Sequence, residues 1–191
     1  MAPAKSRYVA LLRAVNVGGH SVVKMAPLRA VFESCGLTDV ASYIQTGNIL
    51  FTTNEADPAR LARRLETKIA SALGSATVVF VLSPAQLRAA AARNPFDPER
   101  LDKDQLCHLM FLSGEPDSAH RAALMARQGS EYRFHISGKV LYYAYPRRVA
   151  GRRRTINFEG VLGVTGTARS WKVVNKLIEL AGSSRQRDAT A

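Results

Sequence analysis

The stretch at residues 42–52 reads Ser42-Tyr43-Ile44-Gln45-Thr46-Gly47-Asn48-Ile49-Leu50-Phe51-Thr52. Side chains typical of β-strands lie on both sides of Gly47-Asn48, and a Gly-Asn pair between two such runs is typical of a β-hairpin. A single long strand with a bulge at Gly47 is the alternative. The hairpin is the feature that decides the fold, because strand and helix patterns alternate on both sides of it.

The flanking segments complete one α/β plait. Tyr8–Val15 is a nearly continuous apolar run, which predicts a buried strand. Two segments with apolar residues at helical spacing follow, one before and one after the hairpin, and they end at Gly36 and Gly74. Asp57-Pro58 supplies a helix start, and Thr77–Leu82 predicts the last strand. The order β-α-β-β-α-β is that of a ferredoxin-like plait.

The second half repeats this order of elements without a repeat at the level of residues. The expected elements are strands at Gln105–Leu112, Glu131–Ile136 and Lys139–Tyr145 and helices at Asp117–Gln128, within Thr155–Leu162 and at Ser170–Ala181. This order is a plait that lacks its last strand. We therefore predict an α+β protein with two ferredoxin-like plaits, mainly antiparallel sheets with helices on one face. The expected boundaries are residues 1–83 and 105–182 for the plaits, 84–104 for a linking helix and loop, and 183–191 for a flexible tail.

The strand expected at Lys139–Tyr145 is apolar on both faces. One face carries Val140, Tyr142 and Ala144, and the other carries Leu141, Tyr143 and Tyr145. A plait covers only one face of its sheet with its own helices. The second face must therefore meet the other subdomain, a second chain or a stacking ligand.

Composition excludes several classes of protein. Hydrophobic residues make up 47% of the chain and charged residues 22%, which excludes a disordered chain or a collagen-like repeat. Cys35 and Cys107 give neither a disulfide framework nor a zinc pattern. No apolar run approaches the roughly 18–20 residues of a membrane span, and no apolar signal-peptide core follows Met1. We expect a cytoplasmic monomer or homodimer with no cofactor, no metal and no membrane partner.

Positive charge is concentrated toward the carboxyl end. The chain carries 27 Lys and Arg against 15 Asp and Glu, a net charge of +12. Residues 141–191 hold ten of the basic and three of the acidic residues, which is +7. Such a field attracts phosphate-rich partners. Arginine outnumbers lysine 20 to 7 in an alanine-rich chain, so a codon-composition bias without a binding role is the other interpretation.

Several short motifs occur together along the chain. They are Tyr8–Gly19, Met25 with Leu28-Arg29, Tyr43–Asn48, Asn94-Pro95-Phe96, and Thr167–Trp171 with Lys176-Leu177. With this combination, residues 6–181 resemble domain-of-unknown-function family 1697, a widespread bacterial family. The resemblance implies two α/β plaits and brings no established activity. Ser170 stands where the family usually has Asn or Asp, and Ser is an equally good helix N-cap.

The first candidate site is an anion site at the end of the first strand. Its residues are Arg13, Asn16, Gly18, Gly19, Gln45, Gly47 and Asn48. Backbone N–H groups of a Gly-Gly pair can form a nest around an oxyanion, beside the arginine. The hairpin residues join this site if the hairpin turn lies at the same end of the sheet. Turn chemistry is the alternative, because tight turns need Gly and Asn.

Two further candidates are basic. Arg169, Lys172 and Lys176 bring cations to the start of the last helix, whose N-terminus is already positive, so a bound anion would be favourable there. A solvated helix face, with Glu179 pairing Lys176, is the alternative. Arg152, Arg153 and Arg154 follow an aromatic strand, an arrangement with which some plaits bind single-stranded RNA. An exposed basic loop is the alternative.

The sequence thus favours a protein that binds an anionic partner such as nucleic acid through its basic C-terminal quarter. The alternative is a protein or enzyme that binds a small phosphate- or carboxylate-bearing ligand at the Asn16–Gly19 loop and the Gly47-Asn48 turn. Whether the protein is an enzyme stays open, because no arrangement typical of a catalytic nucleophile is present.

Overall fold

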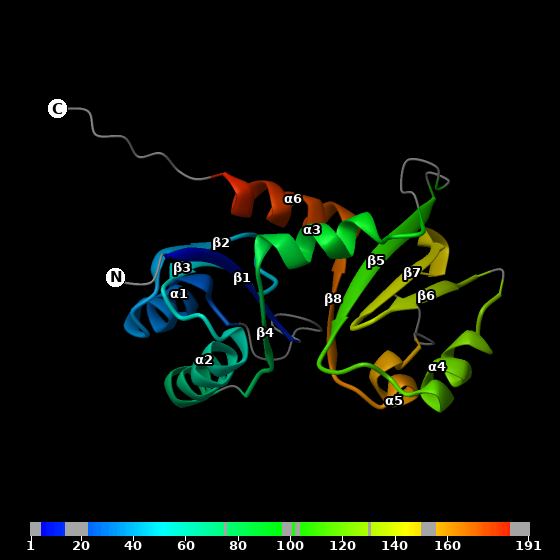
Figure 1. Cartoon of the computed structure of the whole chain (residues 1–191), viewed down its shortest axis with the longest axis horizontal. Helices are drawn as coiled ribbons and strands as arrows, with labels where there is room; N and C mark the ends of the chain where they lie inside the picture. Colours follow the sequence, from blue (N-terminus) through cyan, green and yellow to red (C-terminus); the bar gives the residue numbers. More distant parts are fainter. Residues whose placement is uncertain are drawn as a thin grey trace. The chain divides into compact units, whose positions relative to one another are not determined.

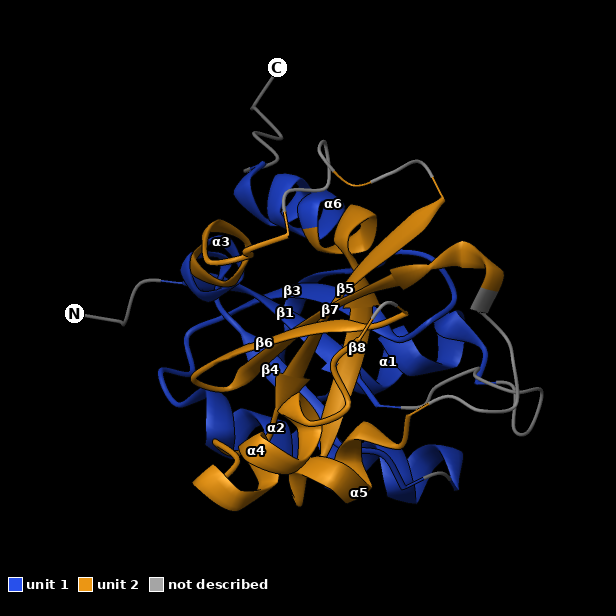
Figure 2. Cartoon of the chain, turned by 90° about the vertical axis from the view of Figure 1, so that its right-hand side faces the viewer, with its two compact units in different colours: residues 1–88, 175–191 blue, residues 89–174 orange. Residues whose placement is uncertain are grey.

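The chain forms two compact units, which are residues 1–88 with 175–191 and residues 89–174 (Figure 2). This computed structural model describes residues 5–13, 23–74, 76–96, 101, 104–129, 131–149 and 156–183. The division between the units falls within two helices, α3 (Pro84–Ala92) and α6 (Trp171–Gly182). Each unit holds a four-stranded antiparallel sheet, and the two predicted ferredoxin-like plaits are confirmed.

The first plait has the predicted order of elements. They are β1 (Ser6–Leu12), α1 (Met25–Ser34), β2 (Thr38–Ser42), β3 (Asn48–Thr53), α2 (Pro58–Leu73) and β4 (Val79–Leu82). The strand order in the sheet is β2-β3-β1-β4, and α1 and α2 lie on one face of it (Figure 1). Of the strand predicted at Tyr8–Val15, residues 14 and 15 lie outside the described part of the chain.

Local chemistry sets the bounds of α2. The Asp57 carboxylate caps the helix, because its Oδ1 accepts hydrogen bonds from the Ala59 and Arg60 nitrogens at 2.9 and 3.1 Å. Pro58 fills the first helical position, where no N–H is needed. Gly74 ends the helix in the left-handed region at φ 63°. Leu61, Leu65 and Ile69 form the buried stripe that packs toward the sheet.

The hairpin was predicted correctly, but its turn was placed too late in the chain. Ser42 pairs with Ile49, and the Tyr43 nitrogen donates to the Asn48 carbonyl at 2.9 Å, so residues 43–47 form the connection. Gly47 has a φ of 71°, as a turn glycine should. Asn48 is therefore the first residue of β3 and is fully buried.

The second plait is complete, and the prediction that it lacks its last strand was wrong. Its elements are β5 (Gln105–Leu112), α4 (Ser118–Met125), β6 (Arg133–Ser137), β7 (Val140–Pro146), a short 3-10 helix (Arg147–Val149), α5 (Phe158–Leu162) and β8 (Gly166–Ser170). The strand order is β6-β7-β5-β8. The sequence of β8, Gly-Thr-Ala-Arg-Ser, is a weak strand pattern, and its pairing with β5 makes it a strand.

Tyr142 on the second face of β7 contacts α3 within the second unit. Leu141 and Tyr143 belong to the core on the side of α4 and α5. Tyr142 points to the opposite side, is 0% exposed, and donates its hydroxyl to the Ala90 carbonyl of α3 at 2.8 Å. The linking helix therefore contacts the sheet face that the plait's own helices leave uncovered.

Candidate functional site

The carboxyl end of β1 and the hairpin turn lie at the same end of the first sheet. Leu11 pairs with Asn48, and the Leu12 nitrogen donates to the Gly47 carbonyl at 2.8 Å. Arg13 follows directly and so lies next to the turn. Arg13 and the hairpin turn are therefore close together, as the first candidate site requires. Three other residues of that site, Asn16, Gly18 and Gly19, lie outside the described residues.

Both backbone polar groups of Arg13, the nitrogen and the carbonyl, form hydrogen bonds. Its nitrogen donates to the Val78 carbonyl at 2.9 Å, and its carbonyl accepts from the Thr77 hydroxyl at 2.8 Å. Both partners lie just before β4. This anchoring fixes the backbone from which the half-buried side chain of Arg13 departs.

Asn48 organises the turn itself. Its Nδ2 donates to the Tyr43 carbonyl at 3.1 Å and to the Thr46 hydroxyl at 3.0 Å. Gly47 is therefore a turn residue, whereas Asn48 stabilises the turn from the first position of β3, because its amide hydrogen-bonds to two residues of the connection. At the tip, Gln45 is exposed, and Ile44 is 46% exposed with a φ of 48°. A β-branched residue in the left-handed region is strained.

Arg169 directly precedes Ser170, where α6 was predicted to begin, and it is also part of β8. Its side chain is only 8% exposed. Its Nη1 donates to the Thr167 hydroxyl and to the Ala168 carbonyl, both at 2.8 Å. Burial lowers the pKa of this guanidinium to about 10, so it remains a cation at neutral pH.

The lysines predicted beside Arg169 lie on α6. Ser170 caps this helix as predicted, because its hydroxyl accepts from the Val173 nitrogen at 3.4 Å. Lys172 is exposed, and Lys176 donates to the Glu179 carboxylate at 2.7 Å, the pairing of the solvated-face alternative. Arg152, Arg153 and Arg154 lie outside the described residues. Of the cations described in residues 156–183, Arg169 is buried and Lys176 is paired, so Lys172 is the more available one.

The second plait contains a stack of aromatic rings around His108 of β5. The Nδ1 atom of His108 is buried without a hydrogen-bond partner among the described residues. Its ring stacks on Tyr143 and Tyr145, with ring centroids 5.3 and 5.5 Å away. Burial lowers the pKa of His108 to about 4. The pairing of β5 with β7 builds this stack, so it was not visible in the sequence of either strand alone.

Neither a metal site nor a membrane-spanning helix is found among the residues that the structure describes. No group of three or more His, Cys, Asp or Glu side chains there has the arrangement of a metal site. No described helix is long and apolar enough to cross a membrane.

Residues 5–142 match the model of a protein family described as "Protein of unknown function (DUF1697)". The chain belongs to this family. The conserved bacterial protein SP0830 from Streptococcus pneumoniae has a similar structure, with a TM-score of 0.73 and 24% sequence identity. The similarity covers 93% of this chain and 99% of that protein. No curated protein matches the chain. Because the function of this family is unknown, membership gives this DUF1697 protein no activity, and its function has to be inferred from its residues.

Proposed function

We propose that this DUF1697 protein binds a small ligand carrying a phosphate or carboxylate group, at the edge where β1 ends beside the β2–β3 hairpin. The observation that carries the proposal is the hydrogen bond from the Leu12 nitrogen to the Gly47 carbonyl, which sets Arg13 next to the turn. An arginine guanidinium presents a planar fork of donors that matches either anion.

The surroundings of Arg13 support the proposal. Thr77 and Val78 hold its backbone, so little conformational freedom of the main chain is lost when the side chain binds a ligand. The exposed Gln45 supplies a neutral polar side chain at the tip of the same turn. Asn48 keeps the turn in one conformation through its two hydrogen bonds.

Arg13→Gln tests this function, and Arg7→Gln is its matched control. Arg7 lies in β1, the strand that ends directly before Arg13, and its loss changes the net charge equally. We expect inorganic phosphate or citrate to bind the wild-type protein measurably by isothermal titration calorimetry. Arg13→Gln should weaken that binding about tenfold or more, because it removes charge-assisted hydrogen bonds, and Arg7→Gln should not. Equal binding by the two variants, or no binding of either anion by the wild type, would refute the proposal.

Nucleic-acid binding through the C-terminal quarter is the second candidate function. The observation that favours it is the net charge of +7 in residues 141–191. Lys172 on α6 and Arg147 after β7 are exposed and available to phosphates. In contrast, Tyr142 is fully buried, so a base cannot stack on its ring.

The salt dependence of binding tests the second candidate. Phosphate contacts release counterions, so affinity for a labelled oligonucleotide should fall steeply between about 50 and 200 mM salt. Replacing Arg152, Arg153 and Arg154 together by Gln should reduce that slope. Absence of binding at the low-salt end would identify the charge as compositional.

A further inference from the structure

The outer face of α2 carries cations and no carboxylate. Its exposed residues are Arg60, Arg63, Arg64 and Lys68, together with Ala59, Thr67, Ala70, Ser71 and Ala72. At 100° per residue the four cations span an arc of about 140°. The buried Leu61, Leu65 and Ile69 occupy the neighbouring arc, which faces the sheet. The single acidic residue of α2, Glu66, is half-buried and accepts a hydrogen bond from the Val79 nitrogen at 2.9 Å.

The stability of α2 does not explain these cations. A basic side chain stabilises a helix near its C-terminus, where the macrodipole is negative. The last turn of α2 contains no basic residue, and the first cation, Arg60, lies in the positive first turn. A face that only keeps the protein soluble would mix both signs of charge.

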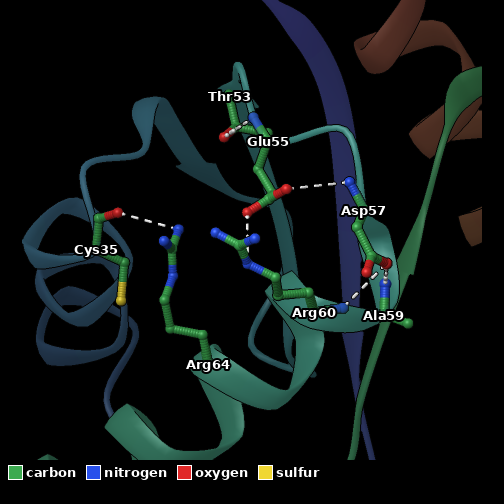
Figure 3. Close-up of polar contacts among 7 residues, drawn as sticks. All are labelled: Cys35, Thr53, Glu55, Asp57, Ala59, Arg60 and Arg64. Atoms are coloured by element: carbon green, nitrogen blue, oxygen red, sulfur yellow. Dashed lines mark hydrogen bonds and ion pairs between the residues drawn. The ribbon is translucent and has the colours of Figure 1, made fainter.

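Two of the four cations are positioned by contacts at the edge of this face (Figure 3). Arg60 pairs with Glu55 at 3.2 Å, and its side chain is still 70% exposed. Arg64 donates to the Cys35 carbonyl at the end of α1, also at 3.2 Å. Glu55 is itself held, since it accepts a hydrogen bond from the Asp57 nitrogen at 3.2 Å. The side chains of Arg63 and Lys68 make no hydrogen bond or ion pair within the described residues, and Arg63 interacts with the Asp57 carboxylate only at a distance. Their charge is therefore available to a partner.

We infer that the outer face of α2, through Arg60, Arg63, Arg64 and Lys68, docks on the phosphate backbone of a nucleic-acid duplex. This inference rests on the nucleic-acid binding proposed above and names a surface for it outside the C-terminal quarter. Arg60 and Lys68 are eight positions apart, or about 12 Å along the helix axis. Along a duplex that length faces about three to four phosphates of one strand.

The chemistry of this face favours a duplex over other polyanions. It has no aromatic side chain on which an unpaired base could stack, as single-strand binding requires. It also has no large apolar side chain to insert into a lipid surface. Three of the four cations are arginines, whose donor fork fits a phosphate. Contacts of this kind hold a duplex without reading its sequence.

The test compares the full-length wild type with two double variants by fluorescence anisotropy, using a labelled DNA duplex, a labelled RNA duplex and a labelled single strand. Arg63→Gln with Lys68→Gln removes the two cations of the α2 face that have no hydrogen bonds. Arg88→Gln with Lys139→Gln is the control, because it removes one exposed Arg and one exposed Lys elsewhere with the same change in net charge. Circular dichroism and thermal unfolding verify that both variants fold.

We expect the α2 variant alone to lose about 1.8 from the slope of log affinity against log salt. Between about 50 and 200 mM salt, the affinity of the wild type should then fall by a factor about 12 larger than that of the α2 variant. If wild type binds a duplex and the two variants have equal slopes, the α2 inference is wrong and nucleic-acid binding stands. If the wild type binds neither duplex nor single strand at low salt, nucleic-acid binding itself fails. Tighter binding of a single strand than of a duplex would also overturn the inference.

Discussion

Replacing His108 by Phe should remove much of the loss of stability that the protein suffers in mild acid. His108 lies in β5 with its ring stacked on Tyr143 and Tyr145. Its Nδ1 is buried and has no hydrogen-bond partner among the described residues. An imidazolium there would be desolvated without compensation, and burial therefore lowers the pKa of His108 from 6.5 to about 4.

The direction of the effect follows from this pKa. In the unfolded chain His108 takes up a proton near pH 6.5, whereas the folded protein resists protonation until about pH 4. Its contribution to stability is therefore fully present above pH 6.5 and is lost as the pH falls from there to about 4. The whole shift corresponds to about 3 kcal/mol, of which about 2 kcal/mol is lost between pH 7 and pH 5.

Urea unfolding at pH 7 and pH 5 measures this loss, for the wild type, His108→Phe and His135→Phe. Phe keeps an aromatic ring in the stack and cannot be protonated. His135 lies exposed on β6 and serves as the control. The free energy of unfolding of His108→Phe should fall by about 2 kcal/mol less than that of the wild type between the two pH values. An equal fall in both proteins, with the control behaving like the wild type, would show that His108 titrates normally in the folded state.

Three further substitutions probe the packing of the two plaits by urea unfolding. Leu65→Ala should cost about 2–5 kcal/mol, because Leu65 is fully buried under the first sheet; a loss below 1 kcal/mol would contradict that burial. Tyr142→Phe should cost about 1 kcal/mol, since the Ala90 carbonyl loses its 2.8 Å hydrogen bond, and an unchanged midpoint would mean that water replaces the hydroxyl. Gly166→Ala should cost about 1–3 kcal/mol, because an added Cβ would stand 2.6 Å from Met110 Cε and 3.0 Å from the Phe111 carbonyl; a neutral result would show that β8 shifts easily.

Elements defined by local chemistry could be predicted from the sequence. Asp57-Pro58 and Gly74 act within a few residues of themselves, and they bound α2 as expected. The strand at Gln105–Leu112 was predicted with the bounds of β5, because its apolar run is long and continuous. In each case the signal lies within the segment that it describes.

Features that depend on partners far along the chain could not be predicted. Gly166–Ser170 contains no strongly β-forming pattern and becomes β8 by pairing with β5. The burial of Arg169 accompanies that pairing, and the sequence beside the helix start did not indicate it. The turn was misplaced for a related reason. Asn48 resembles a turn residue, but its side chain reaches back to the turn from the first position of β3.

The central strands of the two plaits pair in the same register. A residue or turn that only one plait has at a given position is therefore not required by the fold. Asn48 begins β3 and pairs with Leu11, the next-to-last residue of β1. Val140 begins β7 and pairs with Phe111, which has the same place in β5. The second plait closes its hairpin with two residues between Ser137 and Val140, whereas the first uses the five residues of 43–47.

The second plait therefore forms with a valine, Val140, at the position of Asn48 and with a two-residue turn before it. The longer turn in the first plait, and the buried amide that ties it, require a reason outside the fold. That turn carries Gln45 and the strained Ile44 at the edge where Arg13 leaves β1. Departures from local rules concentrate where a protein uses its residues for more than folding. The same comparison applies to Arg169, because it pairs with Leu109 at the register where Leu82 of β4 pairs with Val9. The first plait is built with a leucine there, so the reason for a buried guanidinium lies in what it contacts and not in the topology of the sheet.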